Sequence, residues 1–330
     1  MLALILLALS AMFATLPMCL LLALVWWMDR YEREPIALLV ASFIWGATGA
    51  ILFSLVSGAV VTEVLQQLFL PDLNSSDLGF AVRTAFIAPL TEEPSKALIF
   101  APLLFTRQFD NMTDGFVYGA AVGLGFGMVE NFLYFAGTLD DVGTWVLTVI
   151  IRTLFSATGH AVFTSVVGAS LGLAAFRGPG WVLFSLIVGM SCAIGMHGIW
   201  NGMLNLTAIY DEPGFSAAGF LLAILEFTVA FVIFEVCIFN EGRTVRRELT
   251  EEAKEGLIPL EHARILGQWW GRQSKRWLAP HVPHHRYVEA TTLLAVRRRQ
   301  VRLLGPRARP RDVQEVDVLR TAIRAMLKEP

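Results

Sequence analysis

Apolar side chains follow one another in long uninterrupted blocks through the first 240 residues of the chain, and the blocks then stop. Each block reaches the roughly 20 residues that a helix needs to cross a bilayer, and is too long for a strand. We therefore predict an all-α fold: a polytopic transmembrane helix bundle of about seven spans with a C-terminal helical cytoplasmic tail. The predicted spans are about 2–28, 36–60, 80–105, 115–136, 145–176, 180–210 and 217–240.

The charges in the loops give these spans a direction. Arg30 and Arg33 follow the first span, Arg107 follows the third and Arg177 the fifth, whereas the loops after the fourth and sixth spans carry only acidic charges. Loops rich in Lys and Arg stay in the cytoplasm. The pattern predicts an N-terminus outside the membrane and a C-terminal tail in the cytoplasm.

The charge composition divides the chain at the same place. Residues 1–240 carry 7 Lys+Arg and 17 Asp+Glu, and residues 241–330 carry 19 and 11, so the formal charges of the two parts are −10 and +8. We predict a transmembrane domain over 1–240 and a basic, helical cytoplasmic tail over 241–330. Within the tail, 243–268 and 311–328 are predicted to form amphipathic helices.

Ionisable and amide side chains interrupt the apolar blocks, although a charge in mid-bilayer is costly unless it is paired or faces a polar cavity. The third span carries Glu92, Glu93 and Lys96; the fourth carries Glu130, Asn131 and Tyr134; the fifth carries Arg152 and His160; the sixth carries His197, Asn201 and Asn205. This density exceeds what a passive anchor tolerates, so each of these residues is a functional candidate.

The helical rise of about 1.5 Å per residue gives each candidate a depth below the external surface. Glu92 lies roughly 18 Å deep, His160 roughly 22 Å and His197 roughly 20 Å. Three helices are therefore predicted to bring a carboxylate and two imidazoles to one level. Glu130 and Arg152, at roughly 9 and 10 Å, are predicted to form an ion pair in a second layer nearer the outside.

Two adjacent carboxylates and two histidines can activate water in two ways, and both stay open. In the first, Glu92 or Glu93 is a general base, and His197 with Asn201 donates hydrogen bonds to the oxyanion, without any cofactor. In the second, His160, His197 and Glu93 hold one divalent metal such as zinc, and the other glutamate is the base. The chain has no His-Glu-x-x-His motif, so its metal ligands would come from different helices.

The fourth span also carries Gly115, Gly119, Gly123 and Gly127, a four-residue repeat that exposes bare backbone along one helix face. We interpret this stripe as a packing surface for a neighbouring helix. Pro94 lacks an N–H, and we expect it to bend the third span beside the two carboxylates.

Five ordered motifs resemble the PrsW family of bacterial intramembrane proteases, which is related to the CAAX-prenyl endopeptidase and bacteriocin-immunity superfamily. They are Asp29-Arg30-Tyr31-Glu32-Arg33-Glu34-Pro35, Glu92-Glu93-Pro94-Ser95-Lys96, Glu130-Asn131-x-x-Tyr134, Gly159-His160-Ala161 and His197-Gly198-x-Trp200-Asn201. The resemblance covers about 30–240 and implies a multi-pass protein of the bacterial cell membrane that cleaves a membrane-bound protein substrate, such as an anti-sigma factor.

The same resemblance implies roles for single residues. Glu92 and Glu93 would be the catalytic carboxylates, His160 an essential histidine, and His197 with Asn201 a second catalytic element. From the pattern of polar residues in the spans, we also expect supporting roles for Lys96, Glu130, Asn131, Tyr134, Arg152 and Trp200. Members are commonly classed as metalloproteases, whereas the related prenyl endopeptidases resemble enzymes in which a glutamate activates water.

Two other classes of function remain as alternatives. Intramembrane Glu, His, Lys and Arg also build the pathways of proton- or ion-coupled transporters. A catalytically inactive membrane scaffold or immunity-type protein would keep the same architecture.

The basic tail suits contact with anionic lipid headgroups, because tryptophans and cations are mixed within it. The residues are Trp269, Trp270, Trp277, Arg272, Lys275, Arg276, Arg297, Arg298, Arg299 and Arg302. No nucleic acid is expected as a partner, because 11 acidic residues are interleaved with these basic ones.

A charge swap tests the predicted pair of Glu130 and Arg152. Either single reversal, Glu130→Arg or Arg152→Glu, should lower the melting temperature of the detergent-solubilised protein, because it leaves two like charges facing each other. The double reversal should recover a measurable part of that loss. A double variant no more stable than the singles would contradict the pairing.

Overall fold

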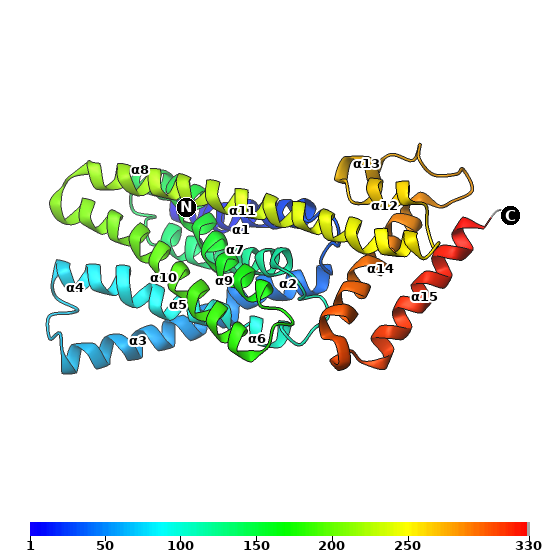
Figure 1. Cartoon of the computed structure of the whole chain (residues 1–330). Helices are drawn as coiled ribbons and strands as arrows, with labels where there is room; N and C mark the ends of the chain where they lie inside the picture. The colour runs from blue at the N-terminus through cyan, green and yellow to red at the C-terminus, as the bar shows by residue number, and fades with distance from the viewer. Residues whose placement is uncertain (329–330) are drawn as a thin grey trace. The chain divides into compact units, whose positions relative to one another are not determined.

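Helices make up most of residues 1–328, the part that this computed structural model describes, and no strand occurs among them (Figure 1). Within these residues, six helices are long and apolar enough to cross a bilayer. They are α1 (Leu2–Met28), the helix Ile36–Leu68, α7 (Met112–Ala136), the helix Val142–Leu173, α10 (Pro179–Tyr210) and α11 (Pro213–Lys254). The predicted all-helical membrane architecture is therefore confirmed.

Two of the six helices contain a wide, π-helical turn. The first consists of α2 (Ile36–Trp45), η1 (Gly46–Ala50) and α3 (Ile51–Leu68); the other consists of α8 (Val142–Ile151), η3 (Arg152–Ser156) and α9 (Ala157–Leu173). Such turns are rare and frequently occur at functional sites. The turn η3 begins at Arg152, one of the candidate residues.

The predicted third span, 80–105, differs from the other six. Its residues form four short segments, namely α4 (Asp77–Val82), the π-helical turn η2 (Arg83–Ile87), α5 (Ala88–Ala97) and α6 (Phe100–Leu103). Pro89 explains the wide turn, because it has no N–H to donate to the carbonyl of Ala85. Pro94 does not end the helix, since α5 continues through it to Ala97. The segment is not among the six candidate spans, so the predicted count of seven is not confirmed.

The central helix of the bundle is α7. In its most apolar stretch 67% of the residues are buried, the largest share among the six candidate spans of the described chain. Helices α1, α2 and α9 all pack against it. Because α7 has protein rather than lipid on most sides, it can carry small and polar residues that a lipid-facing helix could not.

The glycine stripe on α7 is the surface on which α9 packs, as predicted. A Cβ atom added at Gly115, Gly119 or Gly123 would clash with the backbone of α9 at Gly168, Thr164 and His160, respectively. Only glycine lets two helix backbones approach this closely. Gly123 therefore fixes the depth at which the backbone of His160 lies against α7.

The chain falls into two compact units, each with its own apolar core. Unit 1 comprises Met1–Met28 and Glu34–Ile233, and unit 2 comprises Asp29–Arg33 and the chain from Phe234 onward. The predicted domain boundary at residue 240 stays a prediction.

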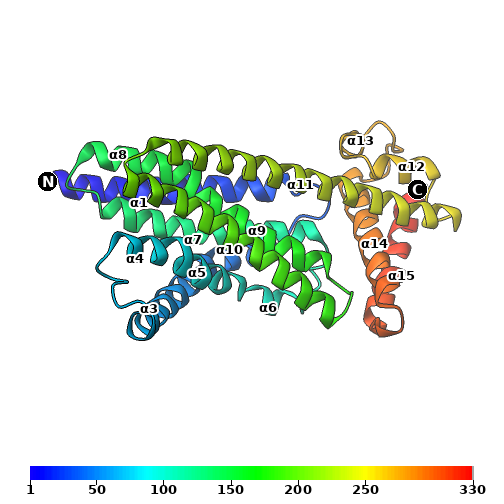
Figure 2. The ribbon, with the colours of Figure 1, turned by 60° about the vertical axis from the view of Figure 1, so that its left-hand side comes forward.

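Unit 2 continues after α11 with four α-helices and one short 3₁₀ turn. They are α12 (Leu260–Leu266), α13 (Trp269–Gln273), α14 (His284–Leu304), η4 (Gly305–Arg307) and α15 (Pro310–Leu327). Helices α14 and α15 lie side by side (Figure 2). The predicted helix 311–328 corresponds to α15. The predicted helix 243–268 is wrong, because Gly256, with φ of +77°, and Pro259 separate the end of α11 from α12.

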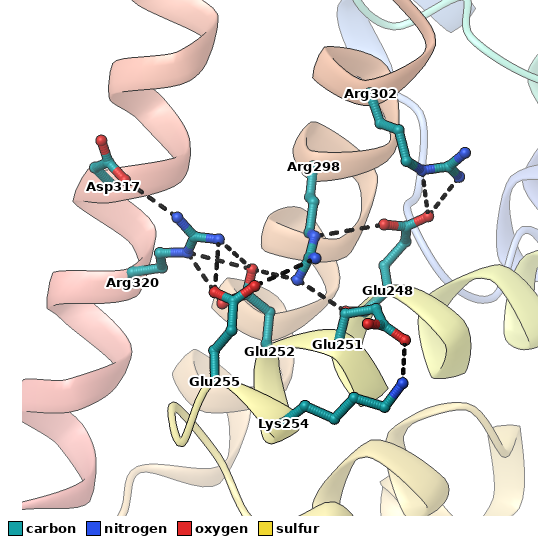
Figure 3. A network of polar contacts seen from close by, with 9 residues as sticks. All are labelled: Glu248, Glu251, Glu252, Lys254, Glu255, Arg298, Arg302, Asp317 and Arg320. Atoms are coloured by element: carbon teal, nitrogen blue, oxygen red, sulfur yellow. Dashed lines mark hydrogen bonds and ion pairs between the residues drawn. The ribbon is translucent and has the colours of Figure 1, made fainter.

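Ion pairs join α11 to the two long helices of unit 2 (Figure 3). Glu252 on α11 accepts from Arg298 of α14 and from Arg320 of α15, each at 2.7 Å. Glu248 accepts from Arg302 of α14 at 2.6 Å. Both glutamates are buried, so these pairs satisfy charges that would otherwise be costly to bury.

A pair of glycine substitutions tests the α7–α9 packing. Gly119→Ala should lower the melting temperature in detergent by several degrees, because overpacking a tight interface costs about 1–3 kcal/mol. The control is Gly195→Ala in α10, where the added Cβ meets nothing within 4 Å. It should leave the melting temperature unchanged or raise it, because alanine favours the helix. Equal effects of the two changes would contradict the packing argument.

Candidate active site

Three helical segments converge on one group of acidic and histidine side chains. Glu92 and Glu93 lie on α5, His160 on α9 and His197 on α10. One ligand atom from each of the four residues lies within 4.8 Å of the others, the sole such group found in the described part of the chain. The depth estimate predicted this meeting of a carboxylate and two imidazoles, and the structure brings them together.

Glu93 is the centre of the hydrogen bonds in this group. Its side chain is fully buried, and its Oε1 atom accepts from Lys96 Nζ at 2.8 Å and from His197 Nδ1 at 2.9 Å. Since a carboxylate only accepts, Nδ1 of His197 carries a hydrogen and donates it to Glu93. The second oxygen, Oε2 of Glu93, is buried and has no hydrogen-bond partner.

Lys96 connects Glu93 to α9 and to α7. Its ammonium lies 3.3 Å from Glu92 Oε2 and 2.9 Å from His160 Nδ1, and 3.9 Å from the centre of the Phe126 ring on α7. An ammonium only donates, so Nδ1 of His160 accepts and the ring hydrogen lies on Nε2. That Nε2 atom in turn donates to Glu130 Oε2 at 2.6 Å.

Glu130 and Arg152 form the predicted ion pair, with 2.7 Å between Nη2 and Oε2, although the contact is not aligned as a hydrogen bond. Arg152 also donates through Nε to Asn131 Oδ1 at 3.2 Å, and its guanidinium lies 3.6 Å from the centre of the Tyr134 ring. The predicted separate layer is wrong, because Glu130 contacts His160 directly. Depth along a helix axis ignores the reach of a long side chain and the close approach of α7 to α9.

Two asparagines hold the wide turn η2 against α10. Asn201 Nδ2 donates to the backbone carbonyl of Thr84 at 2.9 Å, and Asn205 Nδ2 donates to the Thr84 hydroxyl at 2.7 Å. An amide nitrogen carries two N–H groups, so the contact with Thr84 uses one of the two in Asn201. The predicted oxyanion role of Asn201 stays a prediction that rests on the second N–H.

A cavity of about 220 Å³ adjoins this group. Its walls include Glu92, Glu130, Tyr134, Arg152, His160, His197, Trp200 and Asn201. Glu93 is not among the lining residues. The two adjacent glutamates therefore differ: Glu92 faces space that a water or a substrate group can occupy, and Glu93 faces only protein.

Sequence reasoning missed three residues of the site. The ring of Phe126 lies against the ammonium of Lys96, and the ring of Phe163 stacks on that of His197 with 5.3 Å between ring centres. Thr84 accepts hydrogen bonds from the side chains of both asparagines. Phe163 is three residues after His160, so its position on the same helix face was a usable signal. Phe126 and Thr84 lie in apolar segments, and no sequence pattern there indicates their role.

A family model described as "PrsW family intramembrane metalloprotease" matches residues 34–235. The chain belongs to the PrsW family. The Protease PrsW of Oceanobacillus iheyensis is 28% identical over 176 residues, which are 52% of this chain and 72% of that protein. The Protease PrsW of Bacillus subtilis is 28% identical over 164 residues, which are 48% of this chain and 68% of that protein. No solved structure matches the chain.

The family assignment fits the site, because every candidate residue from Glu92 to Asn201 lies within the matched segment. This PrsW-family chain is an intramembrane protease that acts on a protein substrate. Its apolar helices and its relatives make it a multi-pass bacterial membrane protein.

Removing the buried ammonium tests its structural role. Lys96→Met should destabilise the protease by about 3 kcal/mol or more, because it leaves Glu93 as a buried charge without its main counter-charge. The control is Lys254→Met, which removes an exposed partner of Glu251 and should leave the unfolding midpoint unchanged. Unfolding in detergent with a chemical denaturant measures both. Equal stability of the Lys96→Met variant and the parent would refute the role.

Proposed function

We propose that Glu92 is the general base of the protease and that Glu93 positions the groups around it. The observation that carries this proposal is the position of Glu92 in the wall of the cavity, 3.3 Å from Lys96, whereas Glu93 is fully buried. A base must lie within hydrogen-bond reach of the water that it deprotonates. Glu92 takes the proton of a water in the cavity, and the resulting hydroxide attacks the scissile carbonyl.

The oxyanion that forms needs donors that are already in place. Asn201 lines the cavity and has one N–H beyond the one that holds Thr84. We propose that this second N–H donates to the oxyanion. Arg152 also lines the cavity, and its ion pair with Glu130 keeps the acceptor of His160 in place.

The residues of the site also fit a divalent metal such as zinc. His160 and His197 each donate one ring N–H to a glutamate, which leaves the other nitrogen as a ligand, the arrangement that orients metal-binding histidines. The unpartnered Oε2 atom of Glu93 supplies a carboxylate ligand. We propose that His160, His197 and Glu93 would hold the ion, which would polarise the scissile carbonyl and acidify a water.

Lys96 opposes that arrangement. Its ammonium lies within 3.3 Å of Glu92, Glu93 and His160 at once. An ion held by Glu93 and His160 would be a second cation beside this ammonium, and like charges repel each other. Metal binding would therefore require the Lys96 side chain to move away from the imidazole, whereas the scheme in which a glutamate activates water requires no such movement.

The substrate that we propose is a single-pass membrane protein, for which an anti-sigma factor is the family's example. A peptide carbonyl inside a helix is already bonded to an N–H four residues later. The cavity of about 220 Å³ is too small for a helix, whose diameter with side chains is about 10–12 Å. The substrate must therefore unwind locally before its carbonyl reaches Glu92.

We further propose how the chain lies in the membrane. The N-terminus is outside, the tail from about residue 241 is cytoplasmic, and the broken segment 77–103 crosses as a seventh span, since irregular backbone is tolerated at membrane depth where it lines a cavity. The likeness of the Glu-Glu and His motifs supports a relation to the CAAX-prenyl endopeptidase superfamily.

Contact of the tail with anionic lipid is part of the same proposal, but fewer residues are free to make that contact than the sequence analysis predicted. Trp270 is 85% exposed, and Lys275 and Arg276, which follow it in the chain, are exposed as well. By contrast, Arg298 and Arg302 pair with the buried glutamates of α11 (Figure 3). The lipid contact therefore rests on the exposed group of Trp270, Lys275 and Arg276.

A cleavage assay with purified protein and a single-pass peptide tests the base. Glu92→Gln should reduce the cleavage rate by about 10²-fold or more, because it removes the base without changing the shape of the side chain. The control is Glu63→Gln at an exposed position on α3, which should cleave at the parent rate. Parent-level cleavage by Glu92→Gln would exclude Glu92 as the base. Intact substrate throughout, with ion flux lost in the same variant, would favour a transporter instead.

Metal removal separates the two ways of activating water. If the metal scheme operates, as the family description favours, a strong chelator should abolish cleavage, and one equivalent of zinc should restore it. The His160→Ala variant should then retain less metal than the parent after gel filtration. Full cleavage in the chelated protein, with metal below one-tenth of an equivalent by elemental analysis, would establish the metal-free scheme.

A further inference from the structure

A second and larger cavity lies entirely within unit 2, outside the protease site. Its volume is about 520 Å³. The loop 30–33, the helix α13 and the first half of α14 form its walls, which include the cations Arg30 and Arg272, the rings of Tyr31 and Trp269, and the carboxylates Glu32 and Glu289. The protease mechanism uses none of these residues.

Arg272 is the unusual residue of this cavity, because its side chain is charged and yet only 5% exposed. Its Nη2 atom donates to Thr292 Oγ1 at 2.7 Å, and its guanidinium lies 4.9 Å from the centre of the Tyr31 ring. The other terminal nitrogen, Nη1, is buried and has no hydrogen-bond partner. Burial lowers the pKa of Arg272 to about 10, although the charge of Glu241 acts in the opposite direction.

The other lining cations have partners of their own. Arg30 binds Glu235 through both terminal nitrogens, at 3.0 and 2.7 Å, and His285 lies 3.6 Å from Glu289. The guanidinium of Arg272 is oriented by its hydrogen bond to Thr292 and by the Tyr31 ring, and His284 Nε2 donates to the backbone carbonyl of Arg272 at 2.9 Å. A cation that is buried, oriented and short of one acceptor is what an anion site requires.

We propose that this cavity binds the phosphate group of a phosphate ester on the guanidinium of Arg272, with the rings of Tyr31 and Trp269 against the organic part. Arginine matches phosphate well, because its fork of N–H donors can bind two phosphate oxygens at once. The volume exceeds that of an inorganic phosphate, which leaves room for a glycerol or similar group. A missing acceptor for Nη1 is thereby supplied by the ligand.

Two sources present this chemistry, namely a phospholipid headgroup and a soluble phosphate ester. The sequence connects the cavity to the bilayer, because Arg30 follows the apolar helix α1, which ends at Met28, by two residues. Tryptophan and tyrosine are enriched at the headgroup level of membranes. The lipid headgroup is therefore the source that we expect.

Full-length protein in nanodiscs and in detergent tests the proposal with defined probes. Native mass spectrometry measures how many phosphatidylglycerol molecules are retained relative to phosphatidylcholine, and calorimetry measures binding of glycerol 3-phosphate and inorganic phosphate. Arg272→Lys should weaken binding about tenfold, because it removes the planar fork. Gln273→Glu places a negative charge in the wall at an exposed position that folding tolerates, and it should weaken binding severalfold.

The matched control is Gln268→Glu, the same exchange at an exposed residue outside the cavity. It should bind as the parent does. The lipid source is supported if Arg272→Lys and Gln273→Glu reduce the retention of phosphatidylglycerol. The soluble source is supported if the same two variants reduce the binding of glycerol 3-phosphate. The proposal is overturned if no probe binds, or if Gln268→Glu weakens binding as much as Gln273→Glu while all variants keep the parent melting temperature.

Discussion

The carboxylate of Glu93 and the ammonium of Lys96, both closed off from solvent, lie 2.8 Å apart on α5. Neither charge is tolerable alone inside a membrane bundle, so each needs further partners. Glu93 finds its second partner in His197 on α10, and Lys96 finds a partner in His160 on α9. The need to satisfy two buried charges thus holds three helices at one point.

The packing of the bundle serves the same requirement. Because Gly123 brings the α7 backbone against His160, Glu130 of α7 reaches the far nitrogen of that imidazole. The charge of Glu130 is in turn balanced by an ion pair with Arg152, the first residue of the wide turn η3. A chain of alternating charges therefore runs from the buried centre to the wall of the cavity, and each member fixes the orientation of the next.

The sequence was sufficient to predict that Glu92, His160 and His197 converge, because the helical rise determines the depth of a residue along its span. It was insufficient for contacts that depend on how far apart two helices lie. Glu130 was assigned to a separate layer for that reason. The sequence could not predict that the Thr84 carbonyl accepts a hydrogen bond from Asn201. Only the wide turn that Pro89 imposes leaves this backbone carbonyl without a partner inside its own helix. In unit 2, the pairing of Arg298 with Glu252 joins residues 46 apart, and no local pattern indicates it.

A double-mutant cycle on cleavage tests most directly whether Glu93 and His197 act as one unit. The cycle measures kcat/KM for the parent, Glu93→Gln, His197→Ala and the double variant on the same single-pass peptide. If Glu93 acts by holding His197, the double variant should lose no more activity than the worse single variant. Losses that multiply in the double variant would contradict this account, because they would show that the two residues act independently.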